Sequence, residues 1–283
     1  AFILAPAFAE VALDITASIG TLEVGPQIML TIEPARTLGL SGAITNNGLI
    51  DVNPTTSVSN AAVQFNANTS IVGSGVLRLS GGGDDARLLT NGTTLTNGAG
   101  HTIDGAGQIT ASLINEGVVT ALDTGFANRL ELISSTKTNN SNMQAGDGAE
   151  LFISGITINQ APGATIAANA GGIVIFNGNN TINGGRLVGP GAFIKPTSGN
   201  LSLSDVSLEQ DFTVDPGAGV LYNSPAFNCT GRITLNDTSS VSNSFIQFNN
   251  NTIVSGGGSI FLAGGGNDSQ VTTNGTTVTL APG

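Results

Sequence analysis

Apolar and polar residues alternate in short runs along most of the chain. Residues 21–24, 28–32, 130–133 and 201–204 alternate in this way, and residues 172–176 form a short apolar, β-branched run. Glycine, asparagine and proline separate these runs at short intervals, which is typical of β-strands that end in tight turns. No long run has the 3.6-residue apolar period of a helix. The pattern therefore predicts β-strands throughout the chain and very little helix.

A strand, a glycine-rich bend and a second strand recur several times. The bends read GSG, GAG and GPG within residues 71–77, 103–109 and 187–193, and residues 253–260 repeat the pattern. Strands that recur with sharp bends and small insertions are the signature of a solenoid, whose coils bury their apolar faces against the neighbouring coils. The predicted fold class is therefore all-β, a parallel β-helix solenoid, with a right-handed path expected from the general preference of crossover connections.

Three features favour a β-helix over a sandwich or a propeller. Glycine and asparagine adopt positive φ readily, so the chain can turn through a large angle in two residues. Asparagines at equivalent bends can form a ladder of side-chain hydrogen bonds from coil to coil. The scarcity of Lys, Arg and aromatic residues fits a thin cylinder filled by Val, Ile and Leu. With ~20 to 25 residues per coil, we expect about a dozen coils and a rod roughly 55 to 60 Å long.

One stretch of the chain occurs twice. Residues 59–96 and 242–279 align without a gap, each position displaced by 183. The glycines recur, and apolar residues are exchanged for other apolar residues. The charges do not recur, as shown by the pairs Arg78 and Phe261, Asp84 and Asn267, and Arg87 and Gln270. The duplication therefore copies a shape rather than an active site.

Two expectations follow from the duplication. We expect the advance from the first copy to the second to return the solenoid to an equivalent state, which would make this spacing the natural period of end-to-end continuation. We also expect Arg78 and Phe261 to point outward, because each lies between two apolar residues and side chains alternate along a strand.

Composition and charge narrow the classes of partner. The chain has 40 glycines, no tryptophan, one tyrosine and only 10% charged residues, but 40% apolar residues, which excludes ordinary charged disorder. A net charge of −11 disfavours binding to nucleic acid or to an anionic membrane surface. Cys229 is the only cysteine, so an intrachain disulfide is impossible and a free, buried thiol is expected.

The N-terminal residues 1–9 form an apolar segment that ends in Ala7-Phe8-Ala9. Small residues after an apolar run are typical of the cleavage site of a secretory signal peptide. Two interpretations stay open: the segment is a remnant of such a peptide, or it belongs to the mature protein and contacts a neighbouring subunit. Residues 10–283 are expected to form a single β-helix that contains the duplication.

The bends GSG, GAG and GPG, together with ITNNGLIDV and LINEGVVTA, resemble the coils of bacterial surface β-helix proteins. These are autotransporter passengers, filamentous-haemagglutinin-like adhesins and related repeat-rich exoproteins. The resemblance covers most of residues 37–279 and implies secretion, a rod-shaped passenger and a structural or adhesive role. The chain stops at residues 281–283, where the first copy continues into another coil. We therefore expect either a piece of a longer repetitive protein or a subunit whose stack the next molecule continues.

Two acidic groups could carry chemistry, and each has a simpler interpretation. Asp84 and Asp85 follow three glycines and could offer oxygens to Ca²⁺. They lack the tandem pattern of calcium-binding rolls, so an exposed turn is favoured. A second group could supply a carboxylate pair for glycoside cleavage, although a solvated surface is favoured for its members, Asp205, Glu209, Asp211 and Asp215.

Histidine and phosphate chemistry receive no support from the sequence. His101 is the only histidine, which excludes a metal site built from several histidines. We expect His101 at a surface or turn position. The glycine triplets are not followed by Lys and Ser or Thr, so no phosphate loop is indicated. No catalytic, cofactor-binding or metal-binding residue is predicted.

The sequence therefore favours a non-enzymatic, secreted structural protein that forms or extends an extracellular or cell-surface filament by head-to-tail self-association. An alternative is an adhesin passenger that binds a cell or glycan surface, which predicts a lateral groove with clustered aromatic residues. A third hypothesis is a polysaccharide-cleaving β-helix enzyme, which predicts acidic and basic residues that converge on one strand face. No segment approaches the ~20 apolar residues of a membrane span.

Overall fold

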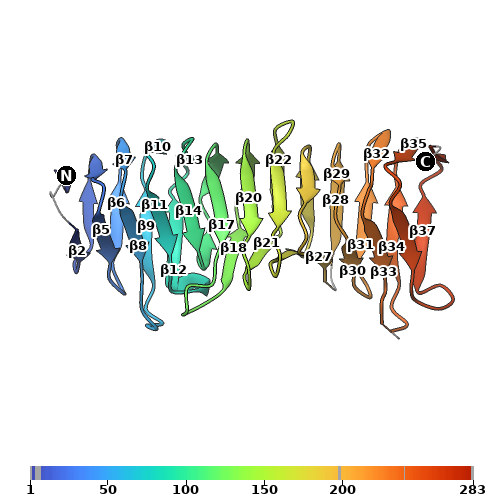
Figure 1. Ribbon diagram of the computed structural model, residues 1–283, viewed down its shortest axis with the longest axis horizontal. Coiled ribbons are helices and arrows are strands. Elements are labelled where there is room, and N and C mark those ends of the chain that lie inside the picture. The colour runs from blue at the N-terminus through green and yellow to red at the C-terminus, as the bar shows by residue number, and fades with distance from the viewer. Residues whose placement is uncertain (1, 4–7, 197–198, 239, 282–283) are drawn as a thin grey trace.

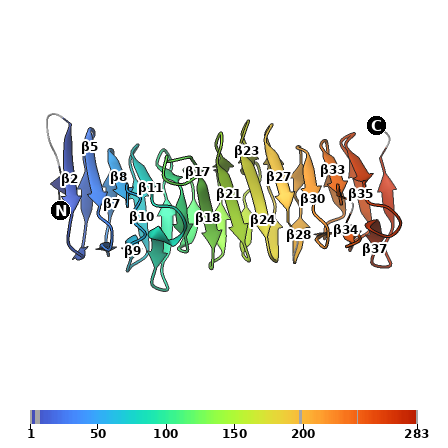
Figure 2. The same ribbon diagram turned by 90° about the horizontal axis from the view of Figure 1, so that it is seen from below.

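The computed structural model of the protein is a rod of stacked coils, with the first strands at one end and the last strands at the other (Figures 1 and 2). It describes residues 2–3, 8–196, 199–238 and 240–281. Each coil supplies one strand to each of three faces, A, B and C, and every ladder between neighbouring strands is parallel. The predicted all-β solenoid of about a dozen coils is confirmed.

Face A holds 13 described strands, which run from the first coil to the last. They are β1 (Phe2–Ile3), β4 (Leu22–Val24), β7 (Ile44–Asn46), β10 (Thr69–Val72), β13 (Thr94–Asn97), β16 (Ser112–Asn115), β19 (Lys137–Asn139), β22 (Thr157–Gln160), β25 (Asn180–Asn183), β28 (Asn200–Ser204), β31 (Gly219–Tyr222), β34 (Ser244–Phe248) and β37 (Ser269–Thr273).

Face B consists of a sheet of 10 described strands and a sheet of 3, which a bridge between Leu208 and Cys229 joins. Its strands are β2 (Ala9–Leu13), β5 (Ile28–Ile32), β8 (Leu49–Val52), β11 (Val76–Leu79), β14 (Thr102–Gly105), β17 (Val118–Ala121), β20 (Asn142–Ala145), β23 (Thr165–Ala168), β26 (Arg186–Val188), β29 (Ser207–Leu208), β32 (Ala226–Asn228), β35 (Thr252–Ser255) and β38 (Val278–Leu280).

Face C holds 12 described strands. They are β3 (Ala17–Ile19), β6 (Thr37–Leu40), β9 (Ala61–Phe65), β12 (Ala86–Thr90), β15 (Gly107–Ile109), β18 (Arg129–Ile133), β21 (Glu150–Ser154), β24 (Ile173–Asn177), β27 (Ala192–Lys195), β30 (Phe212–Val214), β33 (Arg232–Leu235) and β36 (Ser259–Leu262). Within the described part of the chain, the one helical element is the short 3₁₀ turn η1 (Gly83–Asp85).

The strands alternate as the sequence pattern predicts. In β11, Leu77 and Leu79 point into the rod and are fully buried, whereas Arg78 between them points outward. Coil length varies, however, because the bends accept insertions. The coil that joins Thr102 to its ladder partner Val118 is much shorter than the coil that joins Leu49 to Val76. Coils of unequal length still stack because the additional residues lie in the connections and the strand ladders stay continuous.

The core contains aromatic side chains as well as Val, Ile and Leu. Phe176, Phe193 and Phe212 lie on successive strands of face C with ring centroids 6.0–6.4 Å apart. Tyr222 is fully buried and donates a hydrogen bond to the Ala226 carbonyl oxygen at 2.5 Å. Cys229 is a free, buried thiol, as predicted, and burial raises its pKa to about 11.

A ladder of amide side chains runs along the corner between faces A and B, which confirms the predicted asparagine ladder. The Nδ2 atoms of Asn97, Asn115 and Asn139 each donate to the side-chain oxygen in the next coil, at 2.8, 2.9 and 3.1 Å, and the last acceptor is Gln160. Each of these three asparagines also donates to a backbone carbonyl oxygen of a later coil. The ladder therefore satisfies polar groups that the corner buries.

His101 belongs to this ladder, so a surface position is wrong, although the residue does lie at a turn: its backbone N–H donates to the Gly98 carbonyl oxygen at 3.1 Å. Its side chain is fully buried, with Nδ1 2.7 Å from Asn97 Oδ1 and Nε2 3.0 Å from Asn46 Nδ2. The strand β10 lies between the strands of these two asparagines and has no amide side chain at the corner. Its Gly73 lies against the backbone of Asn46, and its Ile71 is the ladder partner of Asn97. The imidazole of His101 takes the place of the missing amide and connects the two asparagines.

Lys137 is a second buried polar group at a corner, between faces C and A. Its Nζ donates to the carbonyl oxygens of Ala111, Ile133 and Ser135 at 2.8, 3.0 and 2.9 Å. Burial lowers the pKa of Lys137 to about 7. The side chain therefore satisfies three carbonyl groups where the chain turns, while its stem fills the core.

The two copies of the duplicated sequence have the same local structure but lie on different faces. β9 of the first copy is on face C, whereas the same residues of the second copy form β34 on face A, 25 strands later. The expectation that the spacing between the copies returns the solenoid to an equivalent state is therefore wrong, because 25 strands are eight coils and one strand. Alternating residues specify a strand and glycine bends specify a turn. All three faces consist of such strands and turns, so the same sequence can form any of them.

The loops that precede the copies also match. Asn53 Nδ2 donates to the carbonyl oxygens of Ser57, Ser59 and Asp85. Asn236, at the equivalent position before the second copy, makes the same three bonds, to Ser240, Ser242 and Asp268. Both asparagines have positive φ, 53° and 51°. Each loop carries an exposed valine near its tip, Val58 or Val241.

Candidate functional site

The last coil presents core-type side chains to solvent. Leu262, Val271 and Leu280 are 47%, 45% and 76% exposed, although their register places them in line with buried or partly buried residues of the preceding coil. The first copy supplies a direct comparison, since the coil that follows it fully buries the residues equivalent to Leu262 and Val271, which are Leu79 and Leu88, and also Asn97, directly after the copy, which is equivalent to Leu280. We call the inward-facing residues at this end of the rod the C-terminal apolar surface: Val254, Ile260, Leu262, Val271, Val278 and Leu280.

Phe261 lies beside this surface and points outward, as predicted. It is 47% exposed, and the Arg232 guanidinium lies over its ring, 4.1 Å from the centroid. Phe261 therefore packs against β33 of the preceding coil through a cation–π contact, which contributes about 0.5–1 kcal/mol at an exposed site. Its inward neighbour Leu262 is exposed because no described strand pairs with the outer edge of β36.

The first coil presents a similar surface at the other end of the rod. Val11 pairs with the buried Leu30 but is itself 37% exposed, and Ala9, Leu13 and Ile19 are partly buried against the core. Phe8 is 70% exposed. Residues 1 and 4–7 of the predicted N-terminal segment lie outside the described residues. The strands β1 to β3 and β36 to β38 each have one edge without a strand partner among the described residues.

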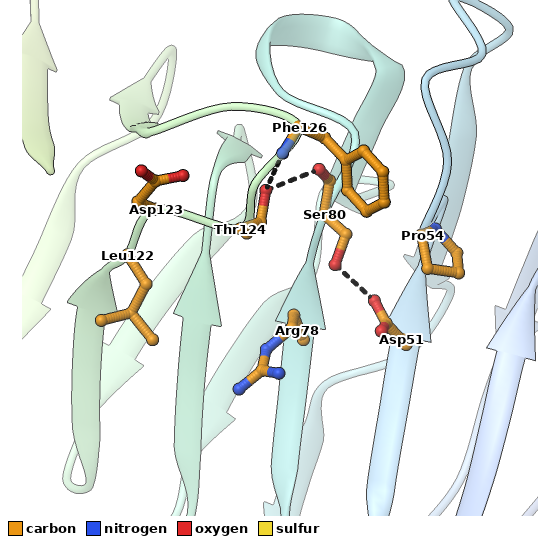
Figure 3. Close-up of a pocket in the computed structure, with 8 residues that line it drawn as sticks. All are labelled: Asp51, Pro54, Arg78, Ser80, Leu122, Asp123, Thr124 and Phe126. Atoms are coloured by element: carbon orange, nitrogen blue, oxygen red, sulfur yellow. Dashed lines mark hydrogen bonds between the residues drawn. The ribbon is translucent and has the colours of Figure 1, made fainter.

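A lateral cleft of about 240 Å³ lies on face B near its corner with face C (Figure 3). The outward side chains of Asp51 on β8 and Arg78 on β11 line it, and Asp104 on β14 lies on the other side of Arg78. Two loops border it and supply its apolar and polar walls, with Pro54 on one side and Leu122, Asp123, Thr124 and Phe126 on the other. The cleft therefore combines charged groups with an exposed aromatic ring.

Arg78 and Asp51 are both hydrogen-bonded to neighbouring side chains. Arg78 donates from Nε and Nη2 to the two carboxylate oxygens of Asp104 at 2.8 and 2.9 Å. Ser80 Oγ donates to Asp51 Oδ1 at 2.6 Å. Burial raises the pKa of Asp51, opposed by the Ser80 hydrogen bond and by the charge of Arg78. Thr124 Oγ1 donates to the Ser80 carbonyl oxygen at 3.0 Å and so holds the loop over the strands.

The cleft was not predicted, but its charges converge on one strand face, which is the pattern expected for a polysaccharide-cleaving β-helix. Asp51 and Asp104 flank Arg78, so about two strand spacings, ~9.6 Å, separate their Cα atoms. In the second copy, Phe261 replaces the arginine. Each of the three charged residues follows two non-acidic strand residues in LID, VLR and TID, and this recurrence was the signal available in the sequence.

The predicted acidic group does not form a site. Its members lie at three corners of one coil, with Asp205 between β28 and β29, Glu209 and Asp211 between β29 and β30, and Asp215 after β30. Glu209 is paired with Arg186, whose Nε donates to its carboxylate at 2.7 Å, and this hydrogen bond lowers the pKa of Glu209. Burial raises the pKa of Asp215. The four carboxylates therefore do not converge on one face.

Asp84 and Asp85 lie in the turn η1, as an exposed turn predicts. Asn60 Nδ2 donates to Asp84 Oδ2 at 3.3 Å. Among the described residues, no three His, Cys, Asp or Glu side chains gather closely enough to hold a metal ion. In the same part of the chain, no helix has the length and apolar character that crossing a membrane requires.

Comparison with known proteins gives no relative from which to transfer a function. No family model matches the chain, and neither the curated proteins nor the solved structures contain a significant match. Function is therefore inferred from the two terminal surfaces and from the lateral cleft.

Proposed function

We propose that the protein is a secreted structural rod that extends by head-to-tail association of its terminal coils. The observation that carries this proposal is the comparison between the two copies of the duplicated sequence. The residues of the first copy are buried by the next coil, and the equivalent residues of the second copy are exposed. A further coil of the same kind is the surface that such residues fit.

The expected gain from covering the C-terminal apolar surface is substantial. Full burial of a Val or Leu side chain contributes about 1.5–3 kcal/mol. Covering the exposed fractions of Leu262, Val271 and Leu280 therefore contributes about 2.5–5 kcal/mol. Strand pairing on three faces adds backbone hydrogen bonds. Together these terms oppose the loss of translational and rotational freedom on association.

The exposed edges support the same conclusion. Natural repeat proteins usually cover their terminal repeats with polar caps, and sheet proteins protect exposed edges with charges or bulges. In the last coil, the described residues of β36, β37 and β38 carry no charged side chain. Head-to-tail contacts that do not close into a ring produce an open filament.

The test compares matched lysine substitutions by sedimentation velocity and electron microscopy over a range of concentrations. We expect the wild-type protein to form elongated assemblies, and Leu262→Lys and Leu280→Lys to remain monomeric. Val58→Lys is the control, because Val58 is 82% exposed on the equivalent loop of the first copy, many coils before the C-terminal apolar surface. A wild-type protein that stays monomeric at high concentration would exclude the proposal.

Secretion is the second part of the proposal, supported by the apolar segment that ends at Ala9. We expect the protein in the extracellular fraction of its source, with Glu10 as its first residue if the segment is a signal peptide. Mass spectrometry of the isolated protein measures this first residue. Recovery of the protein only from the cell interior would contradict secretion.

The lateral cleft favours a second candidate function, binding of a glycan surface by the side of the rod. Phe126 is 47% exposed and could stack on a sugar ring, while Arg78 and Asp51 offer hydrogen-bond partners. Calorimetry with soluble polysaccharides measures binding, and Phe126→Ala should weaken it at least about tenfold, which corresponds to ~1.4 kcal/mol. Release of reducing ends in the same samples would instead indicate cleavage.

A further inference from the structure

The lateral cleft has two apolar walls that come from different coils. Pro54 lies in the loop after β8, and Phe126 lies in the loop after β17, three strands later on face B. Figure 3 shows the ring of Phe126 directed towards Pro54, with the carboxylate of Asp51 below both. A flat ligand can therefore lie against the aromatic ring while one of its substituents reaches Asp51.

The loop that carries Phe126 is held in place by the protein itself. Thr124 Oγ1 donates to the Ser80 carbonyl oxygen at 3.0 Å, and the Thr124 N–H donates to the Ala127 carbonyl oxygen at 2.9 Å. Gly82 lies so close to this loop that a Cβ on it would be 2.4 Å from the Cβ of Ala127. The aromatic wall is therefore preorganised, so a ligand does not have to order it on binding.

The strand framework does not require the polar side chains of the cleft. The duplication shows this, because uncharged residues replace them at the equivalent positions near the second copy, in the pairs Asp51 and Thr234, Arg78 and Phe261, and Ser80 and Ala263. The strands β33 and β36 form with these uncharged residues. The polar set of the cleft is therefore an addition to the coil, and a binding role is a reason for it.

Negative charge exceeds positive charge in the cleft. Arg78 is the one cation that lines it among the described residues, and Asp104 binds the guanidinium through two hydrogen bonds. Asp51 is only 7% exposed, and in the described part of the chain Ser80 is the one side chain that donates to it. Burial raises the pKa of Asp51, which indicates that its negative charge is only partly compensated. The exposed Asp123 adds a further carboxylate.

We propose that the cleft binds a protonated amino group on a sugar ring, so that its ligand is a glycan with free amino groups. This inference deepens the glycan-binding candidate given above and rests on it. The ammonium group donates charge-assisted hydrogen bonds to Asp51, and the apolar face of the sugar ring stacks on Phe126. The negative face of the aromatic ring attracts the same ammonium group.

The geometry disfavours other ligands. An acidic glycan would bring a negative charge beside Asp51, and Arg78 could bind it only by giving up its hydrogen bonds to Asp104. A neutral glycan would leave the buried charge of Asp51 without compensation. A metal ion lacks a ligand set, since no three His, Cys, Asp or Glu side chains gather closely enough in the part of the chain that the structure describes.

The test compares three soluble oligosaccharides of equal length by calorimetry with the wild-type protein at pH 6.0. Oligomers of glucosamine carry free amino groups, oligomers of N-acetylglucosamine lack that charge, and oligomers of galacturonic acid carry carboxylates. We expect the glucosamine oligomer to bind at least about tenfold more tightly than either of the others. This comparison does not depend on the folding of a variant.

A pair of matched variants locates the charge that is recognised. Asp51→Asn removes the charge and keeps an acceptor for Ser80, and we expect it to weaken binding of the glucosamine oligomer at least about tenfold. Asp147→Asn is the control, because Asp147 is an exposed carboxylate after β20, at the same corner of a later coil. It changes the net charge equally and should leave the affinity unchanged. Circular dichroism verifies that both variants keep their strands.

Each contrary result has a distinct meaning. Equal binding of the glucosamine and N-acetylglucosamine oligomers, or tighter binding of the galacturonic acid oligomer, would overturn the amino-group site while glycan binding itself stands. Equal weakening by Asp51→Asn and Asp147→Asn would also overturn it, because the attraction would then come from the overall negative charge of the protein. Absence of binding by all three oligomers would refute the glycan-binding candidate together with this inference.

Discussion

His101 makes the stability of the rod dependent on pH in a predictable window. Asn46 Nδ2 donates to the Val76 carbonyl oxygen, and its Oδ1 accepts from Gly48 N, so the amide orientation is fixed and Nδ2 faces the imidazole as a donor. On the other side, Asn97 Oδ1 accepts from Nδ1. The native ring therefore carries its proton on Nδ1, and a second proton on Nε2 would face an N–H group.

The magnitude follows from the pKa. Burial lowers the pKa of His101 from 6.5 to about 4. Between these values the unfolded chain binds a proton that the native protein does not, so stability falls as the pH falls through this window. Each unit of pKa difference is about 1.36 kcal/mol, so the full loss is about 3.4 kcal/mol below pH 4. At pH 5, the expected loss relative to pH 7.5 is about 2 kcal/mol.

The assay is denaturant unfolding of the wild type and of His101→Gln at pH 7.5, 6.0 and 5.0, followed by circular dichroism. Gln has an acceptor and a donor for the two asparagines but no proton to gain in this range. We expect the difference in unfolding free energy between the two proteins to change by about 2 kcal/mol from pH 7.5 to 5.0, to the disadvantage of the wild type. Parallel pH curves would refute the buried, neutral histidine.

Three further predictions concern other buried polar groups. Asn115→Ala removes the donor to Asn139 Oδ1 and to the Asn142 carbonyl oxygen, and it should lower the unfolding free energy by about 2–4 kcal/mol in a urea titration. The control Asn183→Ala removes an exposed hydrogen bond and should lower the unfolding free energy by less than about 1 kcal/mol. The pKa of Lys137 is lowered to about 7, so between pH 7 and 10.5 the unfolded chain binds a proton that the native protein does not. The unfolding free energy should therefore rise with pH across that range by up to about 5 kcal/mol, and the Lys137→Met variant should lack this rise. Cys229 should react with a thiol reagent only after unfolding, and rapid labelling of the native protein would contradict its burial.

The sequence predicted the solenoid because its signals are local. Alternation, glycine bends and bend asparagines each depend on neighbouring residues, and the ladder from Asn97 to Gln160 follows once the coils stack. The position of His101 depends instead on β10, a strand of the preceding coil, which has Ile71 and Gly73 where an amide would continue the ladder. Predicting that His101 connects Asn46 to Asn97 requires the register between strands of neighbouring coils, and the sequence of a single strand does not specify that register.

The lateral cleft and the face shift were missed for the same reason. Asp51, Arg78 and Asp104 become neighbours only through ladders that join one coil to the next. The length of a coil changes with each insertion, so a residue's face cannot be counted from the N-terminus.

The shifted copy has a consequence for how such rods can change in length. A tandem segment does not have to span whole turns to be accommodated, because the same residues form strands on face C in one place and on face A in the other. Genetic duplication or loss of a single strand with its bend would then keep the core intact and rotate everything beyond it. The direction in which a side loop points around the rod axis, such as the loops that carry Val58 and Val241, can therefore change when a strand is inserted elsewhere in the chain.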